Sequence, residues 1–209
     1  MNTLINDGLL SWEDYLSYGK RLFFKENSVI FEQGDVGSGF YYIKGGLIKI
    51  VSTSSNKNDR ILDIVGPGLL IGEQTIDQLP YYSTAISQAD SVLYYFTEKD
   101  YENLTRKNPE VITLLAHSLI LKEKLLLNNI NATGTDSDYQ IAHSLLYLME
   151  SYQSKEINLT QQDLSCYVGL TRITVYKVLK SWAFEGILSI KNRKIYIIDP
   201  NALRAKLLD

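Results

Sequence analysis

Cysteine and long apolar runs are scarce in this sequence, and their absence excludes several classes of protein. The 209 residues include one cysteine, Cys166, so one chain can form neither a disulfide nor a metal or iron–sulfur site from several cysteines. No window reaches the roughly 18 consecutive apolar residues of a membrane-spanning helix. The first ten residues lack the basic and apolar segments of a secretory signal. We therefore expect a cytoplasmic protein that needs no cofactor and does not contact the membrane.

Positive charge is concentrated near the end of the chain. The formal net charge is −3, but residues 155–209 carry nine Lys/Arg against five Asp/Glu, a balance of +4 that leaves −7 for the rest. These cations can simply solvate exposed faces. A basic segment joined to an acidic body also indicates that the C-terminal part binds a polyanion.

The region from Leu22 to about Thr97 has the composition of a β domain. Short runs rich in Val, Ile, Phe and Tyr, such as SVIFEQ, GFYYIKGGLIKIVS and SVLYYF, are separated by glycine-bearing turns. Glycines at these places allow tight bends or positive φ angles. Many short strands at close spacing predict a sandwich, roll or barrel.

A helix of about 22 residues is expected from Pro109 to about Ile130. Its apolar residues recur at three- and four-residue steps, and proline suits the first turn. Further apolar residues, including Leu119, Leu126 and Leu127, make the helix hydrophobic over more than one stripe, so it must bury two faces. One face would pack on the β domain and the other on a second copy of the chain. The alternative is a core helix of a monomer.

The segment Ile157–Ile198 has the organisation of a helix–turn–helix followed by a β wing. Thr160 with Asp163 three residues later is typical of a helix start, Gly169 permits a tight turn, and Thr171 caps a second helix. Two apolar strands then flank a hairpin tip with two cations. The polar stretch 131–138 is the expected linker to this part of the chain, and residues 139–152 are expected to form an amphipathic helix.

The solvent-facing side of the second helix is expected to contact DNA. Arg172, Ile173 and Lys177 lie near one face of its first two turns and would enter a major groove about 12 Å wide. Contacts to phosphates fix the register, and contacts to base edges give sequence preference. The predicted DNA-binding residues are Thr160, Gln162, Thr171, Arg172, Ile173, Tyr176, Lys177, Lys180, Lys191 and Arg193.

Four motifs, in this order, resemble those of the Crp/Fnr family of bacterial transcription regulators. They are VIFEQGD (Val29–Asp35), GFYYIKGGLIKI (Gly39–Ile50), GPGLLIGE (Gly66–Glu73) and LTQQDLSCYVGLTRITVYKVLKSW (Leu159–Trp182). The resemblance covers about residues 20–200.

The resemblance implies an α+β fold in three parts. Residues 1–107 would form a sensor domain of the cyclic-nucleotide-binding type, an antiparallel β-roll similar to a jelly roll or cupin. Residues 108–131 would form a dimerisation helix, and 132–209 a winged helix–turn–helix domain. A homodimer joined through 109–130 would bind a palindromic site on double-stranded DNA, with RNA polymerase as the expected protein partner.

The expected effector pocket departs from that of the cAMP-binding members of the family. Those members have an arginine followed by a serine for the cyclic phosphate, and the resemblance puts Ser83 and Thr84 at these positions. No Lys or Arg lies between Arg60 and Lys99. A phosphate would therefore lack a charge-assisted partner, and the loss of such hydrogen bonds costs about 1.5–3 kcal/mol.

The adenine end of the pocket also disagrees with a cyclic nucleotide. Positions that carry adenine-contacting hydroxyls in cAMP-responsive relatives fall on Leu126 and Leu127. These two leucines, together with Tyr81 and Tyr82, suit an aromatic or apolar effector. The alternative is that side chains fill the pocket and the protein is active without an effector. The predicted pocket residues are Gly72, Glu73, Tyr82, Ser83, Thr84, Leu126 and Leu127.

Iron–sulfur and haem effectors, used by other branches of the family, are disfavoured. Residues 1–30 contain no cysteine, and both histidines, His117 and His143, lie on expected helices outside the β domain. A β region without histidine also cannot supply the clustered ligands of a metal-dependent cupin enzyme. We therefore expect no catalytic residue and no metal site.

The leading hypothesis is a sequence-specific DNA-binding transcription regulator that is constitutive or uses an effector other than a cyclic nucleotide. Well-known members of the family have a glutamate where this chain has Ile173. Isoleucine can pack only on an apolar group such as the thymine methyl, so an A·T-richer site is expected. The alternative is a ligand-sensing module that acts through a protein partner.

Overall fold

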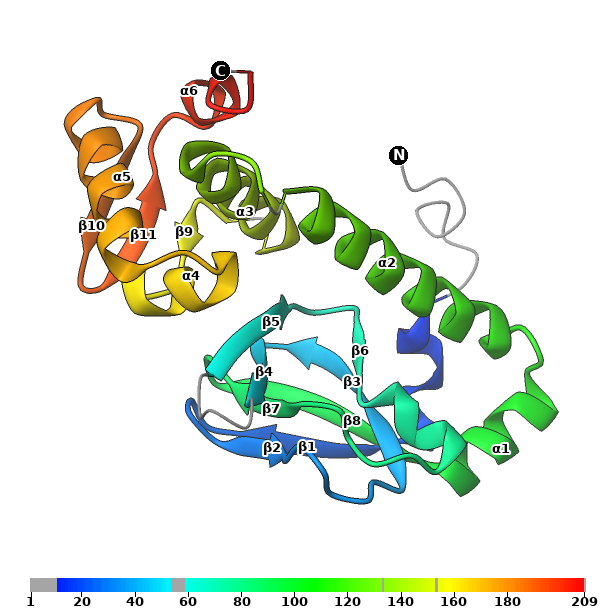
Figure 1. The fold of residues 1–209 in the computed structure, drawn as a ribbon. Coiled ribbons are helices and arrows are strands. Elements are labelled where there is room, and N and C mark those ends of the chain that lie inside the picture. Colours follow the sequence, from blue (N-terminus) through cyan, green and yellow to red (C-terminus); the bar gives the residue numbers. More distant parts are fainter. Residues whose placement is uncertain (1–10, 54–58, 133, 153, 209) are drawn as a thin grey trace. The chain divides into compact units, whose positions relative to one another are not determined.

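The computed structural model describes residues 11–53, 59–132, 134–152 and 154–208 (Figure 1). These residues divide into two compact units, the first with 11–53 and 65–125, the second with 59–64 and the remainder from 126 onwards. The prediction about a secretory signal concerns residues 1–10, which lie outside the described ranges. Among the described helices, none is both long enough and apolar enough to cross a membrane.

Antiparallel strands dominate the first unit. One sheet has the order β1-β8-β3-β6, with β1 (Lys20–Phe24), β8 (Ser91–Thr97), β3 (Gly39–Gly45) and β6 (Leu70–Ile71). The other has the order β2-β7-β4-β5, with β2 (Val29–Phe31), β7 (Thr84–Ser87), β4 (Ile48–Thr53) and β5 (Asp59–Val65), of which residues 59–64 are grouped with the second unit. Every strand pair of these sheets with a described register is antiparallel, which confirms the predicted β-roll.

Helices close the β-roll. They are η1 (Trp12–Tyr18), η2 (Glu73–Asp77), α1 (Glu98–Lys107) and α2 (Val111–Ala132), whose last turns belong to the second unit. The helix expected from Pro109 is confirmed as α2, and it begins at Val111 because residues 109–110 form a turn. The other three helices, η1, η2 and α1, were not predicted from the sequence.

Aromatic side chains form the core between the strands and these helices. Phe40 of β3 and Phe96 of β8 are partners in register, are fully buried, and stack with ring centroids 5.4 Å apart. Trp12 packs edge-on against Phe40, and Val111 and Leu114 of α2 belong to the same cluster. Each large side chain buried here contributes about 1.5–3 kcal/mol to stability. One face of α2 is thereby fixed to the β-roll.

The second unit is a winged helix–turn–helix. Its elements are α3 (Ser137–Tyr152), β9 (Glu156–Ile157), α4 (Gln161–Val168), α5 (Arg172–Phe184), β10 (Leu188–Lys191), β11 (Lys194–Ile197) and α6 (Pro200–Ala205). The sheet order is β10-β11-β9. The inward face of α5 is formed by Val175, Val178, Leu179 and Trp182, which are all buried. The predicted linker, 131–138, is too long at both ends, because α2 continues to Ala132 and α3 begins at Ser137. Its residue 133 lies outside the described ranges.

Candidate nucleic-acid interface

Side-chain caps hold the two helices of the motif at the predicted residues. The Thr160 hydroxyl accepts a hydrogen bond from the N–H of Asp163 (3.0 Å), and the Asp163 carboxylate accepts one from the N–H of Thr160 (3.3 Å). Gly169 ends α4 with a φ of 75°, and the Thr171 hydroxyl accepts from the N–H of Thr174 (3.2 Å) at the start of α5. Such caps contribute about 1 kcal/mol each. They fix where α5, the recognition helix, begins.

The wing, defined as the β10–β11 hairpin, carries its cations on a two-residue turn. Lys191 and Lys194 are the last paired residues, and Asn192 and Arg193 between them have φ angles of 50° and 64°. Positive φ at both positions matches the right-handed twist of the flanking strands. Lys191 and Arg193 are exposed at this turn, as predicted.

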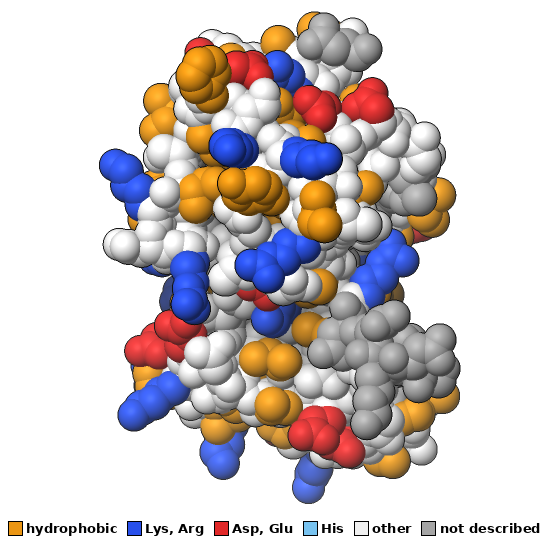
Figure 2. All heavy atoms as spheres, turned by 60° about the vertical axis from the view of Figure 1, so that its left-hand side comes forward, with side chains coloured by type: hydrophobic (Ala, Val, Ile, Leu, Met, Phe, Trp, Pro, Cys, Tyr) orange, Lys and Arg blue, Asp and Glu red, His pale blue; other side chains and the backbone are white. Residues whose placement is uncertain are grey.

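The outward face of α5 contains five of the predicted DNA-binding side chains. Arg172, Ile173, Tyr176, Lys177 and Lys180 are all exposed, and Ile173 has 68% of its surface accessible. The Lys180 ammonium lies 5.8 Å from the centre of the Tyr176 ring. Figure 2 shows Lys and Arg side chains interspersed with hydrophobic ones on the face that carries α5 and the wing.

A hollow of about 450 Å³ joins the two helix starts to the wing. Its lining residues are Thr160, Gln161, Gln162, Arg172, Ile190 and Arg193. It brings together four of the ten predicted DNA-binding residues, from three separate elements. Two guanidinium groups beside helix N-termini favour an anion such as a phosphate group.

None of the predicted DNA-binding cations makes an ion pair with a residue that the structure describes. These cations are Arg172, Lys177, Lys180, Lys191 and Arg193. By contrast, Lys194 in the same wing pairs with Glu156 at 2.5 Å. Unneutralised cations on one face raise the local positive potential and attract a polyanion.

The long helix α2 has one buried face and one exposed apolar face. Val111, Leu114, Ser118 and Leu125 are buried. Its large apolar side chains with half or more of their surface accessible are Ile112, Leu119, Ile120, Leu126, Leu127 and Ile130, which we call the α2 stripe. The stripe includes both leucines predicted for the effector pocket, each more than half exposed.

The remaining predicted effector residues differ in exposure. Gly72 lies before η2 with a φ of 82°, and Ser83 is 9% exposed. The Thr84 hydroxyl already accepts a hydrogen bond from the N–H of Gln33 (3.0 Å). Tyr82 is 59% exposed, whereas its neighbour Tyr81 is buried. The exposed fractions of these side chains therefore do not indicate that they line one cavity.

Glu73 is buried and already paired. Its side chain is 5% exposed, and both carboxylate oxygens accept hydrogen bonds from the Lys122 ammonium at 2.6 Å. The Ser118 hydroxyl donates to one of these oxygens (3.2 Å). Lys122 was not predicted from the sequence, although a lysine four residues after Ser118 on an apolar helix was a usable signal.

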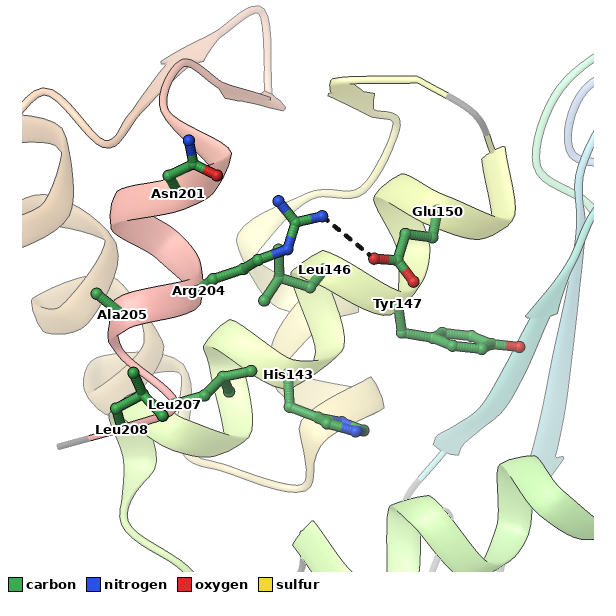
Figure 3. A pocket seen from close by; sticks show the side chains of 9 residues that line it. All are labelled: His143, Leu146, Tyr147, Glu150, Asn201, Arg204, Ala205, Leu207 and Leu208. Atoms are coloured by element: carbon green, nitrogen blue, oxygen red, sulfur yellow. Dashed lines mark hydrogen bonds and ion pairs between the residues drawn. The ribbon is translucent and has the colours of Figure 1, made fainter. Parts of the chain in front are cut away.

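A second hollow, of about 560 Å³, lies between α3 and α6 and contains none of the predicted site residues (Figure 3). Arg204 of α6 faces Glu150 of α3 across it at 3.4 Å, a solvent-exposed pair worth about 0–1 kcal/mol. His143 lines the same hollow, and burial lowers the pKa of its imidazole. Cys166, the single cysteine, is half-buried and accepts a hydrogen bond from the Gln162 amide.

Comparison with known proteins matches both units to domain families. Residues 21–108 match the cyclic nucleotide-binding domain, and residues 140–206 match the Crp-like helix-turn-helix domain. The "Cyclic AMP receptor protein" of Thermus thermophilus is 28% identical over 184 residues, which cover 84% of this chain and 82% of the relative. A "CRP-like cAMP-activated global transcriptional regulator" of Mycobacterium tuberculosis is 25% identical, covering 86% and 84%.

Solved structures show the same fold. A CRP/FNR-family transcriptional regulator of Thermus thermophilus superposes with a TM-score of 0.79 at 24% identity, covering 91% of this chain and 99% of that one. FixK2 of Bradyrhizobium japonicum gives 0.79 at 16% identity, covering 90% and 96%. A β-roll followed by a helix–turn–helix, both matched to their domain families in this order, identifies the chain as a Crp/Fnr-type transcription regulator and not an enzyme.

Proposed function

We propose that the protein works as a cytoplasmic homodimer that binds a palindromic, A·T-rich promoter site and regulates transcription there together with RNA polymerase. The observation that carries this proposal is a set of five exposed cations on α5 and the wing that make no ion pair with a described residue: Arg172, Lys177, Lys180, Lys191 and Arg193. The hollow lined by Arg172 and Arg193 suits a backbone phosphate. The activity is constitutive or set by an effector other than a cyclic nucleotide.

The α2 stripe supports the dimer. A helix with large apolar side chains exposed along more than four turns needs a second surface to cover them. Ile112, Leu119 and Leu126 recur at seven-residue steps, the repeat that two packed helices share. A twofold dimer would place its two recognition helices on half-sites one DNA turn, about 34–36 Å, apart.

Sequence preference rests on the apolar residue among the cations of the recognition helix. Ile173 is two-thirds exposed and stands beside Arg172 and one turn from Lys177. Its side chain has no hydrogen-bonding group, so it favours the thymine methyl over a cytosine amine. This supports a half-site richer in A·T than that of relatives with a glutamate here.

The experiment is an in vitro selection of binding sites from random duplex DNA, with the wild-type protein and Ile173→Glu. We expect a palindrome with A·T pairs opposite Ile173, and a shift to G·C at that position in the variant, with discrimination of about 1–3 kcal/mol per base pair. Ile198→Glu, which charges a comparably exposed isoleucine away from α5, is the matched control. The same base preference in Ile173→Glu and wild type would contradict the assignment, and failure to select any site would contradict the proposed function.

A further inference from the structure

We infer that the effector site of the β-roll is occupied by the chain's own side chains, so that the unliganded protein is the DNA-binding form. This inference rests on the proposed function and specifies how it is regulated. The residues concerned surround Gly72 and Glu73, which the Crp/Fnr resemblance assigns to the effector.

Two aromatic rings fill the space beside Gly72. A β-carbon built on this glycine would lie 3.0 Å from the Tyr81 ring and 3.4 Å from the Phe31 ring. The two rings stack with centroids 3.9 Å apart and an interplanar angle of 12°. The Tyr81 hydroxyl donates to the carbonyl of Gly39 (3.2 Å), and Tyr81 is only 5% exposed. A phosphate approaching the Gly72 backbone from this side would have to separate the stack and expose both rings to water.

The carboxylate of Glu73 is already bound by side chains of α2. Lys122 and Ser118 together supply three hydrogen bonds to its carboxylate. A ligand hydroxyl would have to compete with two charge-assisted bonds, which are about twice as strong as neutral ones. No Lys or Arg occurs at residues 61–98, so the pocket-forming sequence has no cation of its own to offer a phosphate.

The Glu73–Lys122 ion pair links the β-roll to α2. Glu73 is the first residue of η2, and Lys122 lies in the middle of α2, the helix that carries the proposed dimer contact. An effector shifts a regulator only by binding one arrangement better than another. The Glu73–Lys122 pair stabilises one arrangement of η2 and α2 permanently, as a ligand would do on binding.

The first test is titration of the purified full-length protein with cAMP and cGMP. Calorimetry should detect no binding up to about 1 mM nucleotide, and DNA affinity with and without nucleotide should agree within about two-fold. A nucleotide that binds below that concentration, or raises DNA affinity about ten-fold, would overturn the inference.

The second test breaks the ion pair. Lys122→Met should lower DNA affinity by about ten-fold or more, within the range typical of coupling between two sites, while Lys122→Arg should retain it. The double variant Glu73→Gln, Lys122→Met replaces both charges by neutral side chains of similar size. The melting temperature of this double variant should return to that of the wild type, whereas its DNA affinity should stay as low as that of Lys122→Met. Lys44→Met removes the Lys44–Glu13 ion pair of the same unit and should leave DNA affinity unchanged.

Wild-type affinity in Lys122→Met, or full recovery of affinity in the double variant, would show that the pair only holds the fold together. The calorimetric result separates this inference from the proposed function. If the protein binds neither nucleotide nor any DNA, the proposed function fails and the closed pocket stands. If DNA binding requires a nucleotide, the closed pocket fails and the DNA-binding function stands.

Discussion

Removing the two wing cations should flatten the dependence of DNA binding on salt. Each phosphate that a cation neutralises contributes about 0.9 to the slope of log affinity against log salt. The proposed DNA-binding face carries five exposed cations per protomer, and therefore ten in the proposed dimer: Arg172, Lys177, Lys180, Lys191 and Arg193 of each chain. If every one contacts a phosphate, the slope reaches about −9.

The wing supplies four of these ten cations in the dimer. Lys191→Gln with Arg193→Asn should bring the slope to about −5.4. Asparagine is the choice at Arg193 because it tolerates the left-handed φ of 64° there. Between 50 and 200 mM salt, the wild-type protein should then lose about 100-fold more affinity than the variant.

Fluorescence anisotropy with a labelled duplex, at four or more salt concentrations, measures both slopes. The matched control replaces two exposed lysines of the first unit, Lys25→Gln with Lys99→Gln, which changes the net charge equally. It should leave the slope unchanged. A wing variant that stays folded and dimeric but keeps the wild-type slope would show that the wing does not contact phosphates.

Two further predictions concern stability. Trp182→Ala removes a side chain that is 1% exposed and should destabilise the second unit by about 3–5 kcal/mol. Phe184→Ala, at a 96% exposed position of the same helix, should change stability by less than about 0.5 kcal/mol. Thermal unfolding followed by circular dichroism compares the two variants, and equal effects would contradict the assigned core. Burial lowers the pKa of His143 below its ordinary 6.5, so below that pH the unfolded chain takes up the proton more readily and stability falls as pH decreases. His143→Gln should weaken this dependence when melting temperatures at several pH values between 5 and 7.5 are compared, and an identical dependence would contradict it.

Local signals made the helix–turn–helix predictable. Caps such as Thr160 and turns such as Gly169 act within three or four residues, and the structure contains them where the sequence places them. The sequence did not reveal α1 in the same way. This helix is short and polar, and Leu104 is its only residue described as buried, so it has little apolar periodicity to detect.

Long-range contacts limited the prediction of the effector site. Glu73 and Lys122 are 49 residues apart, and only the packing of α2 on the β-roll brings them together. Likewise, Tyr81 and Tyr82 are neighbours of the same type, but one is buried in a ring stack and the other is exposed. Periodicity and composition describe single elements, and these contacts depend on how elements pack.

The charges and the apolar stripe have different consequences for recognition. Cations that contact phosphates would give affinity for any DNA, because such contacts are independent of sequence. Ile173, the apolar residue among them, contributes at most about 1–3 kcal/mol of discrimination for the base pair it contacts. One half-site therefore distinguishes its sequence weakly, and two half-sites joined in one complex double the discrimination, to a factor of about 30 to 10⁴. In the proposed dimer, the α2 stripe would hold two copies of α5 together, and a protein that binds DNA generally would thereby become one that selects a promoter.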